Sequence, residues 1–287
     1  MKQFHYHEPK TVEEACLMMA ELGDNAKLIA GGTDLVVQMN RGAKAPSHVV
    51  SVKTIQGLDS IIENEEGFRI GAATLLADIS DHKGMQSKLP MLCSAARSIG
   101  SAQVRNLSTV GGNICNAAPS ADMAPGLLAL NAIVTIAGHE NLRTLPLEEF
   151  FVGPGIVNLE KGEILTEIFV PTPTSGTQQV YLKHGPRRAM DCAVVGVAVT
   201  LLFEQPTGRC QQARIALGAV GPTPLRAKMT EKLLVGKTFN EFPLDRIAEL
   251  AAQEASPISD VRASADYRCE MVSTFTKRAI VQLASFA

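Results

Sequence analysis

Two glycine pairs are the residues of this sequence best suited to binding chemistry. The first pair lies in Ile29–Val36, IAGGTDLV, and the second in Ser108–Asn116, STVGGNICN. A bound diphosphate needs several backbone N–H groups that point into one concavity, and glycine lets the backbone approach without a side chain in the way. A Thr or Asn after each pair adds one more hydrogen-bond donor. Either segment alone is typical of an ordinary strand-to-loop turn, but together they predict two halves of one diphosphate site.

The common nucleotide-binding motifs are absent from the sequence. No G-x-G-x-x-G occurs, so a Rossmann dinucleotide site has no support. Gly236–Thr238 could end a P-loop pattern, but the first glycine of that pattern would have to stand where the chain has Glu231. A phosphate site made of two separated loops therefore remains the better interpretation.

The sequence predicts neither a catalytic side chain nor a metal site. There is no G-x-S-x-G around a nucleophilic serine. His5 and His7 alternate like residues on one face of a strand, but no third ligand lies near them. The cysteines form no C-x-x-C pair, so neither zinc nor a locally ligated iron–sulfur cluster is indicated. They are Cys16, Cys93, Cys115, Cys192, Cys210 and Cys269.

Composition and charge exclude several classes of protein. The 287 residues carry 27 Lys and Arg against 29 Asp and Glu, with no basic run, so we expect no nucleic-acid binding. The longest apolar run, Cys192–Phe203, is shorter than the roughly 18 residues that span a bilayer. The first residues lack the features of a signal peptide, and the scattered cysteines are typical of reduced thiols. We therefore expect a cytoplasmic protein with no membrane span.

The elements before residue 55 predict an α/β unit that presents the first glycine pair. Thr11 and Glu14 have the spacing of a capping box, and apolar residues then follow one helical face up to Gly23. Ala26–Ala30 and His48–Val52 are short runs typical of strands, and the first glycine loop directly follows the first of them. A further helix between the two strands leaves room for a parallel pair.

Short apolar runs alternate with helical segments between residues 56 and 175. Leu89–Ile99 and Ser120–Ala132 have helical spacing, the second with a bend or a new start at Pro125. Glu163–Val170 is typical of a strand. Val170–Gln179, VPTPTSGTQQ, concentrates Pro, Thr, Ser and Gly and is the strongest linker candidate.

Beyond this linker the pattern is strands first and helices afterwards. Strand-like runs at Cys192–Phe203 and Arg214–Val220 precede helical patterns at Leu244–Glu254 and Ser264–Ala284. This order predicts an α+β lobe. The predicted domains are 1–175, with subdomains of about 1–55 and 56–175, and 176–287.

Five segments of the chain resemble the FAD-binding subunit of the xanthine dehydrogenase type of molybdenum hydroxylase, in particular the separate FAD (medium) subunit of bacterial enzymes. They run through nearly the whole chain in the family's order. A single A-G-G-T motif is weak evidence for a family, but the ordered set of five segments is highly specific. The resemblance implies a mixed α/β (α+β) structure: a two-subdomain FAD-binding fold of the PCMH/vanillyl-alcohol-oxidase-like type, followed by an α+β C-terminal lobe. The segments are Leu28–Met39, Leu89–Pro125, Val152–Pro171, Tyr181–Ala198 and Ile215–Ala227.

The resemblance implies a noncovalently bound FAD and assigns residues of both glycine loops to it. In the family, the first loop wraps the FAD diphosphate with backbone amides, and the second closes on the same diphosphate and the ribityl chain. The matching residues are Leu28, Ile29, Ala30, Gly31, Gly32, Thr33, Asp34 and Leu35 in the first loop and Thr109, Val110, Gly111, Gly112 and Asn113 in the second.

Four further residues match positions at the cofactor in the family. Asp122 matches an acidic residue on the adenosine side, although it also suits the N-terminus of a helix. Leu165 matches a backbone contact to the adenine region, and Lys183 a lysine whose charge stabilises anionic flavin or phosphate. Ile99 stands where the animal enzymes place an aromatic residue beside the flavin ring, so stacking is lost and their acceptor preference should not be transferred to this chain.

The resemblance implies an electron-transfer subunit of a heterotrimer whose hydroxylation chemistry takes place in a partner. A large molybdopterin subunit oxidises xanthine or a similar N-heterocycle, a subunit with two [2Fe–2S] clusters relays the electrons, and the FAD of this chain passes them to NAD+ or another acceptor. Arg187 and Arg188 are candidates for steering an anionic acceptor, with a solvated basic turn as the alternative. The alternatives for the whole chain are a stand-alone FAD-dependent oxidoreductase of the same fold, a FAD subunit for nicotinate or another substrate, and a scaffold subunit with a decayed flavin site.

Overall fold

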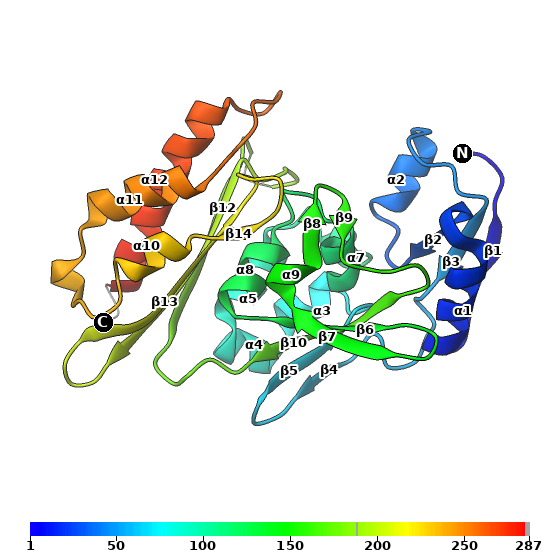
Figure 1. Ribbon diagram of the computed structural model, residues 1–287, viewed down its shortest axis with the longest axis horizontal. Helices are drawn as coiled ribbons and strands as arrows, with labels where there is room; N and C mark the ends of the chain where they lie inside the picture. The colour runs from blue at the N-terminus through cyan, green and yellow to red at the C-terminus, as the bar shows by residue number, and fades with distance from the viewer. Residues whose placement is uncertain (188, 285–287) are drawn as a thin grey trace.

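The computed structural model describes residues 1–187 and 189–284, and these form three blocks in a row (Figure 1). An N-terminal block lies at one end, a larger mixed block in the middle, and a C-terminal lobe at the other end. Each block joins a sheet to helices, so the predicted mixed α/β class is confirmed.

The N-terminal block is a three-stranded parallel sheet that carries the first glycine loop. Its strands are β1 (His5–His7), β2 (Ala26–Ile29) and β3 (His48–Ser51), in the order β1–β3–β2. β2 pairs in parallel with β3, with Leu28 opposite Val50, as predicted. The connection from β2 to β3 contains the loop and then helix α2 (Leu35–Asn40). The loop therefore leaves the carboxyl end of a parallel strand, a common place for ligand binding in α/β folds.

Helix α1 (Val12–Leu22) packs on this sheet and is followed by the short helix η1 (Gly23–Asn25). The Thr11 hydroxyl accepts a hydrogen bond from the N–H of Glu14 at 3.2 Å, as the capping box predicts. The Glu14 carboxylate, however, binds the N–H of Lys10 instead of the N–H of Thr11. Only half of the predicted capping box therefore forms, because the carboxylate reaches one residue further back.

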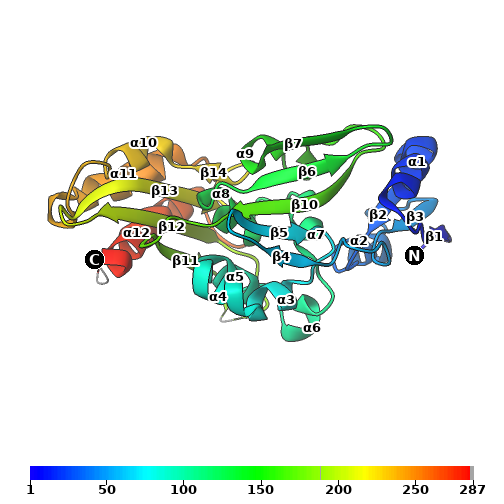
Figure 2. The same cartoon turned by 90° about the horizontal axis from the view of Figure 1, so that it is seen from below.

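The middle block is a five-stranded antiparallel sheet, whose strands are seen side by side in Figure 2 and whose helices gather above it in Figure 1. The strand order is β4–β5–β10–β6–β7, so β10 (Ile164–Pro171), from the end of the block, lies at its centre. The other strands are β4 (Ile61–Glu63), β5 (Gly67–Gly71), β6 (Ile133–Ala137) and β7 (Leu142–Pro146), and β8 (Phe151–Gly153) and β9 (Ile156–Val157) form a separate hairpin. The helices are α3 (Leu76–Asp81), α4 (Lys83–Lys88), α5 (Pro90–Arg97), α6 (Ala102–Arg105), α7 (Val110–Cys115), α8 (Met123–Ala129) and α9 (Leu147–Phe150).

Helix α8 begins at Met123, so Pro125 lies in its first turn, where a missing N–H costs little.

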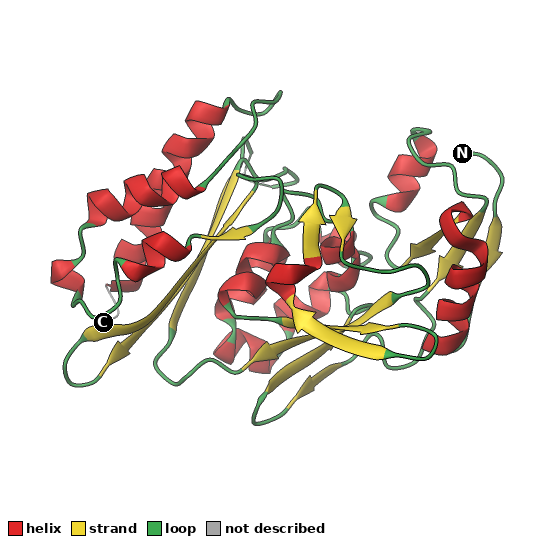
Figure 3. Cartoon of the chain, viewed as in Figure 1, coloured by secondary structure: helices red, strands yellow, loops and turns green. Residues whose placement is uncertain are grey.

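The C-terminal lobe is a four-stranded antiparallel sheet with long helices on its outer face (Figure 3). Its strands, in sheet order, are β11 (Gln178–His184), β12 (Val195–Glu204), β13 (Arg209–Gly218) and β14 (Leu225–Arg226). Its helices are α10 (Lys228–Lys232), η2 (Phe239–Glu241), α11 (Leu244–Glu254) and α12 (Ala265–Ala284). The order of strands first and helices afterwards agrees with the sequence pattern.

Strand β12 explains the longest apolar run of the sequence, because both of its faces are buried. Val197 and Val199 point into the core under α11 and α12, whereas Ala198 belongs to the core of the middle block and packs toward α8. A strand covered on both faces has a continuous apolar sequence instead of an alternating one. The loop at 172–177 joins β10 to β11, where the linker was expected, yet the blocks on either side of it share this core. The domain division at residue 175 stays a prediction.

Among the described residues, no helix has the length and apolar character needed to cross a membrane.

Candidate functional site

One cavity of about 860 Å³ lies where the three blocks meet. Its walls come from the first glycine loop, from helices α6 and α7 and the loops next to them, and from the segment 186–192 with Arg262 of the C-terminal lobe. A volume of several hundred Å³ is typical of a site for a large organic ligand. Of the residues predicted to bind the cofactor, all except Val110 and Lys183 line this cavity.

The first glycine loop offers the cavity a row of free backbone donors. Among the described residues, no protein acceptor receives a hydrogen bond from the N–H groups of Gly31, Gly32, Thr33 or Asp34. Gly32 has a φ of +72°, a left-handed conformation that turns the chain between the strand and helix α2. Successive N–H groups exposed in such a turn form a concavity that attracts anions. The loop therefore has the form expected of a phosphate cradle.

The two glycine loops lie directly against each other. A β-carbon on Gly31 would overlap the carbonyl oxygen of Leu107, just before the second loop. Gly111 is equally constrained, because its β-carbon would come within 2.5 Å of the carbonyl oxygen of Ala72. Gly31 and Gly111 are therefore both required for close backbone packing, and the contact of Gly31 with Leu107 brings the two loops to one cavity.

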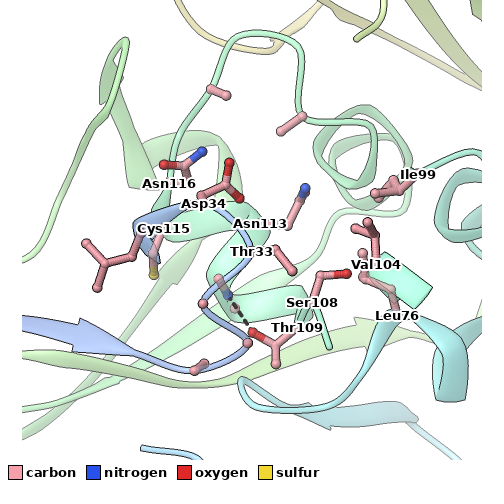
Figure 4. Close-up of a pocket in the computed structure, with 18 of the residues that line it drawn as sticks. Thr33, Asp34, Leu76, Ile99, Val104, Ser108, Thr109, Asn113, Cys115 and Asn116 are labelled. Atoms are coloured by element: carbon pink, nitrogen blue, oxygen red, sulfur yellow. Dashed lines mark hydrogen bonds between the residues drawn. The ribbon is translucent and has the colours of Figure 1, made fainter. Parts of the chain in front are cut away.

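The second loop differs from the first because the backbone donors of Val110, Gly111 and Gly112 are already used. The N–H of Val110 donates to Thr74 and that of Gly111 to Ala72, at 3.0 and 2.9 Å. The N–H of Gly112 binds the Thr109 hydroxyl, which caps helix α7 at 3.1 Å (Figure 4). The second loop can therefore contribute side chains to a ligand more readily than backbone amides. Val110 itself is fully buried beneath the loop.

Three buried polar side-chain atoms in the cavity wall have no partner among the described residues. They are Oε1 of Gln38, Oγ of Ser108 and Oδ1 of Asn113. An unpaired buried polar atom costs about 1–3 kcal/mol, so such atoms usually meet a ligand or an ordered water. Their position on the same cavity as the free amides fits a large polar ligand.

The cavity has an apolar side and a polar side. Leu76, Ile99 and Val104 lie together on one side, while Asp34 and Asn116 lie on the opposite side (Figure 4). Burial raises the pKa of the Asp34 carboxyl above its ordinary value, and Lys44 partly opposes this. The apolar side suits one face of a ring system, and the polar side suits hydroxyl or phosphate groups.

Asp122 reaches the cavity from a buried ionic network. Its carboxylate accepts hydrogen bonds from the hydroxyl of Tyr181 at 2.7 Å and from Nζ of Lys183 at 2.9 Å. Lys183 also donates to the carbonyl of Ser98 at 3.0 Å and lies 3.7 Å from Asp191. Desolvation raises the pKa of the Asp122 carboxyl, and the charge of Lys183 opposes that rise. Lys183 thus compensates Asp122 and Asp191 and does not itself line the cavity.

The remaining predicted residues occupy different parts of the wall. Leu165, at the start of β10, lines the cavity beside the N-terminal block, far along the chain from both glycine loops. Arg187 lines the mouth and donates to the carbonyl of Met190 at 2.5 Å. Arg188 lies outside the described residues. No group of His, Cys, Asp and Glu among the described residues is arranged to hold a metal ion.

The structure adds cavity residues that the sequence did not single out. Ser108 and Asn116 flank the second glycine pair, so their polar types were visible in the quoted segment. Gln38 lies on α2, beyond the first loop, and its role depends on how that short helix turns. Arg262 comes from the turn before α12, and no local signal relates it to the glycine loops.

Comparison with known proteins gives full-length similarities. Residues 2–173 match the family described as the FAD binding domain in molybdopterin dehydrogenase, and residues 180–283 match the CO dehydrogenase flavoprotein C-terminal domain. The chain is 35% identical to the xanthine dehydrogenase FAD-binding subunit of Escherichia coli O157:H7, over 98% of this chain and 96% of that protein. It is also 35% identical to the carbon monoxide dehydrogenase medium chain of Hydrogenophaga pseudoflava, over 97% and 96%. A solved carbon monoxide dehydrogenase from Hydrogenophaga pseudoflava superimposes with a TM-score of 0.94, covering 99% of this chain and 97% of that one.

Proposed function

The chain belongs to the family of FAD-binding medium subunits of the molybdenum hydroxylases, and on that premise we propose that it binds one FAD between its two glycine loops and passes electrons from the [2Fe–2S] clusters of a partner subunit to NAD+. Hydroxylation of the substrate belongs to a molybdopterin-containing partner in this family. Bound FAD supplies the redox chemistry, and the residues of this chain supply its position and its electrostatic surroundings.

The single observation that carries the proposal is the set of unused polar groups on one cavity. The amides of Gly31 to Asp34 have no protein acceptor among the described residues, and the side chains of Gln38, Ser108 and Asn113 carry buried oxygen atoms with no partner. A FAD diphosphate needs hydrogen-bond donors such as these free backbone amides. The ribityl hydroxyls of FAD can donate hydrogen bonds to the unpaired side-chain oxygens. The residues present therefore fit the cofactor that the family implies.

We assign the flavin end and the adenine end of the cavity from the hydrogen bonds that Lys183 makes. Ile99 matches the family position beside the flavin ring, and Lys183 links Asp122 to the carbonyl of Ser98, the residue before Ile99. On this basis we propose Asp122 at the flavin end, whereas the resemblance implied the adenosine side. Leu165 lies on β10 next to the N-terminal block, which fits its predicted place at the adenine.

The partners, the acceptor and the substrate are part of the same proposal. We expect a heterotrimer in the cytoplasm, with an iron–sulfur subunit and a large molybdenum subunit. We propose xanthine or a similar N-heterocycle as the substrate, although a carbon monoxide dehydrogenase chain is equally similar in sequence. The substrate pocket lies in the partner, so the substrate has to be identified on the whole assembly.

The experiment is purification of the native assembly without denaturants, followed by metal and flavin analysis. The proposal predicts about four iron atoms and one molybdenum per FAD, as two [2Fe–2S] clusters and one molybdopterin site require. Under anaerobic conditions xanthine or a related heterocycle should bleach the flavin, and NAD+ should restore its colour. A flavoprotein that purifies without iron and molybdenum would instead support the stand-alone oxidoreductase. Bleaching by carbon monoxide alone would contradict the proposed substrate class.

A further inference from the structure

Arg262 is a cation at the mouth of the flavin cavity, supplied by the turn between α11 and α12. It lines the same cavity as the two glycine loops. Its side chain nevertheless keeps 43% of its surface exposed to solvent. A guanidinium with one side on a cavity and the other on solvent is placed to meet a ligand that arrives from outside.

A buried arginine holds this turn in place. Arg268 is almost fully buried and donates to the carbonyls of Val194 and Ala219, at 2.7 and 3.1 Å. It also donates to the Asp260 carboxylate at 2.8 Å, and Asp260 in turn accepts from the backbone N–H of Arg262 at 2.8 Å and from its Nη1 at 3.0 Å. Hydrogen bonding to the N–H of Arg262 is the first of the causes that lower the pKa of Asp260 to about 2, so Asp260 stays ionised. Arg262 is thus oriented by the protein itself, without a ligand.

The positive charge at the mouth is not fully compensated. Asp260 is shared by Arg262 and Arg268, so one carboxylate faces two guanidinium groups. Arg187, which lines the same cavity, donates to the neutral carbonyl of Met190. Asp191, an acid on the same wall, lies 3.7 Å from Lys183, which it shares with Asp122. Its carboxylate also accepts a hydrogen bond from the backbone N–H of Arg187 at 3.2 Å. The free amides for the FAD diphosphate lie on another loop, so the charge of Arg262 remains for a second anion.

We propose that Arg262 selects phosphate-bearing electron acceptors at this mouth and favours an anionic dinucleotide over neutral acceptors. A guanidinium presents a planar pair of donors that matches the oxygen atoms of a phosphate. The inference rests on the proposed function, because an electron acceptor docks at this mouth only if the cavity holds a flavin. It goes further by naming the residue that sets the chemical class of the acceptor.

The test compares two acceptors on the FAD-loaded full chain after chemical reduction. NAD+ is the anionic probe and benzoquinone the neutral probe, and the rate of flavin re-oxidation is followed for each. In Arg262→Ala the rate constant with NAD+ should fall about tenfold, equivalent to about 1.4 kcal/mol, while the rate with benzoquinone stays within about twofold. Arg262→Lys should retain part of the NAD+ rate. The matched control is Arg246→Ala on α11, whose exposed pair with Glu249 is away from the cavity.

A binding measurement accompanies the rates. Titration with ADP-ribose, followed by the flavin difference spectrum, should give an affinity about tenfold weaker in Arg262→Ala than in the wild type. Loss of FAD from the variant, an equal fall with both acceptors, or an unchanged NAD+ rate would each overturn the inference. A wild-type chain that retains no FAD would overturn the proposed function as well, so the two failures are distinguishable.

Discussion

The backbone of Gly31 lies so close to the carbonyl oxygen of Leu107 that residue 31 has no room for a β-carbon. This contact joins the first glycine loop to the segment that leads into the second. It explains why two loops far apart in sequence form one cavity. The glycine is needed here for close packing of two backbones, and the N–H groups that follow it remain free for a ligand.

Gly31→Ala should destabilise the protein by about 1–3 kcal/mol, the usual cost of overpacking, and should weaken FAD binding at the same time. Thermal unfolding of the FAD-free chain measures the first effect. Gly153→Ala is the matched control, because its β-carbon would meet only Ile156 at 3.9 Å, an ordinary contact. If both variants unfold at the wild-type temperature, the packing role of Gly31 is wrong.

Asn113→Ala should have opposite effects on the empty and the FAD-loaded protein. The variant loses a buried oxygen that has no protein partner, so the FAD-free chain should be as stable as the wild type or more so. If that oxygen accepts a hydrogen bond from FAD, the dissociation constant of FAD should rise about tenfold. Equilibrium titration with FAD and thermal unfolding without it measure the two effects. An unchanged affinity would remove Asn113 from the cofactor site.

Lys183→Met should destabilise the protein strongly at neutral pH and less at acid pH. Removing one member of a buried ion pair costs about 3–5 kcal/mol, because the other charge stays buried. Burial already raises the pKa of Asp122 above its ordinary 3.8, and loss of Lys183 should raise it further. An acid with a raised pKa stabilises the fold below its ordinary pKa, and this contribution is lost as the pH rises through the folded value.

Unfolding at pH 5 and at pH 7.5 therefore distinguishes the variants. The loss of stability in Lys183→Met should be larger at pH 7.5. Lys228→Met is the control, since its pair with Glu148 is exposed and should contribute less than about 1 kcal/mol at either pH. Equal losses at both pH values would show that Asp122 does not titrate as described.

Ile99→Phe should alter the flavin and leave the fold intact. Ile99 is partly buried and lines the apolar side of the cavity with Leu76 and Val104. An aromatic ring there can stack on a flavin ring, which should quench the flavin fluorescence well below that of the wild type. Ile99→Leu keeps an aliphatic side chain and serves as the control. Equal fluorescence of both variants at full FAD occupancy would place the flavin ring elsewhere.

The sequence predicted the strands, loops and helices that form the site better than the hydrogen bonds between side chains that are distant in sequence. Apolar spacing and glycine positions predicted the parallel pair β2–β3, the loop after β2 and the C-terminal helix α12. The pairing of Asp122 with Lys183 and Tyr181 joins α8 to β11 across the chain, and no local pattern records such a contact.

Gly111 shows where reasoning from residue types was incomplete. The sequence suggested that glycines in both loops let the backbone approach a diphosphate. In the structure Gly111 packs on Ala72 and its N–H is already bonded, so only the first loop presents a row of free amides. The difference depends on how α7 packs within the middle block, which spacing alone does not specify. A Gly111→Val variant would therefore test folding as much as cofactor binding.

The flavin content of the purified protein tests most simply whether this chain binds one FAD in the cavity between its glycine loops. The protein is denatured, and the flavin released is identified and counted against the polypeptide. We predict one noncovalent FAD per chain, reduced to a small fraction in a Gly31→Ala, Asn113→Ala double variant that remains folded. A colourless wild-type protein that cannot be reconstituted with FAD would contradict the claim.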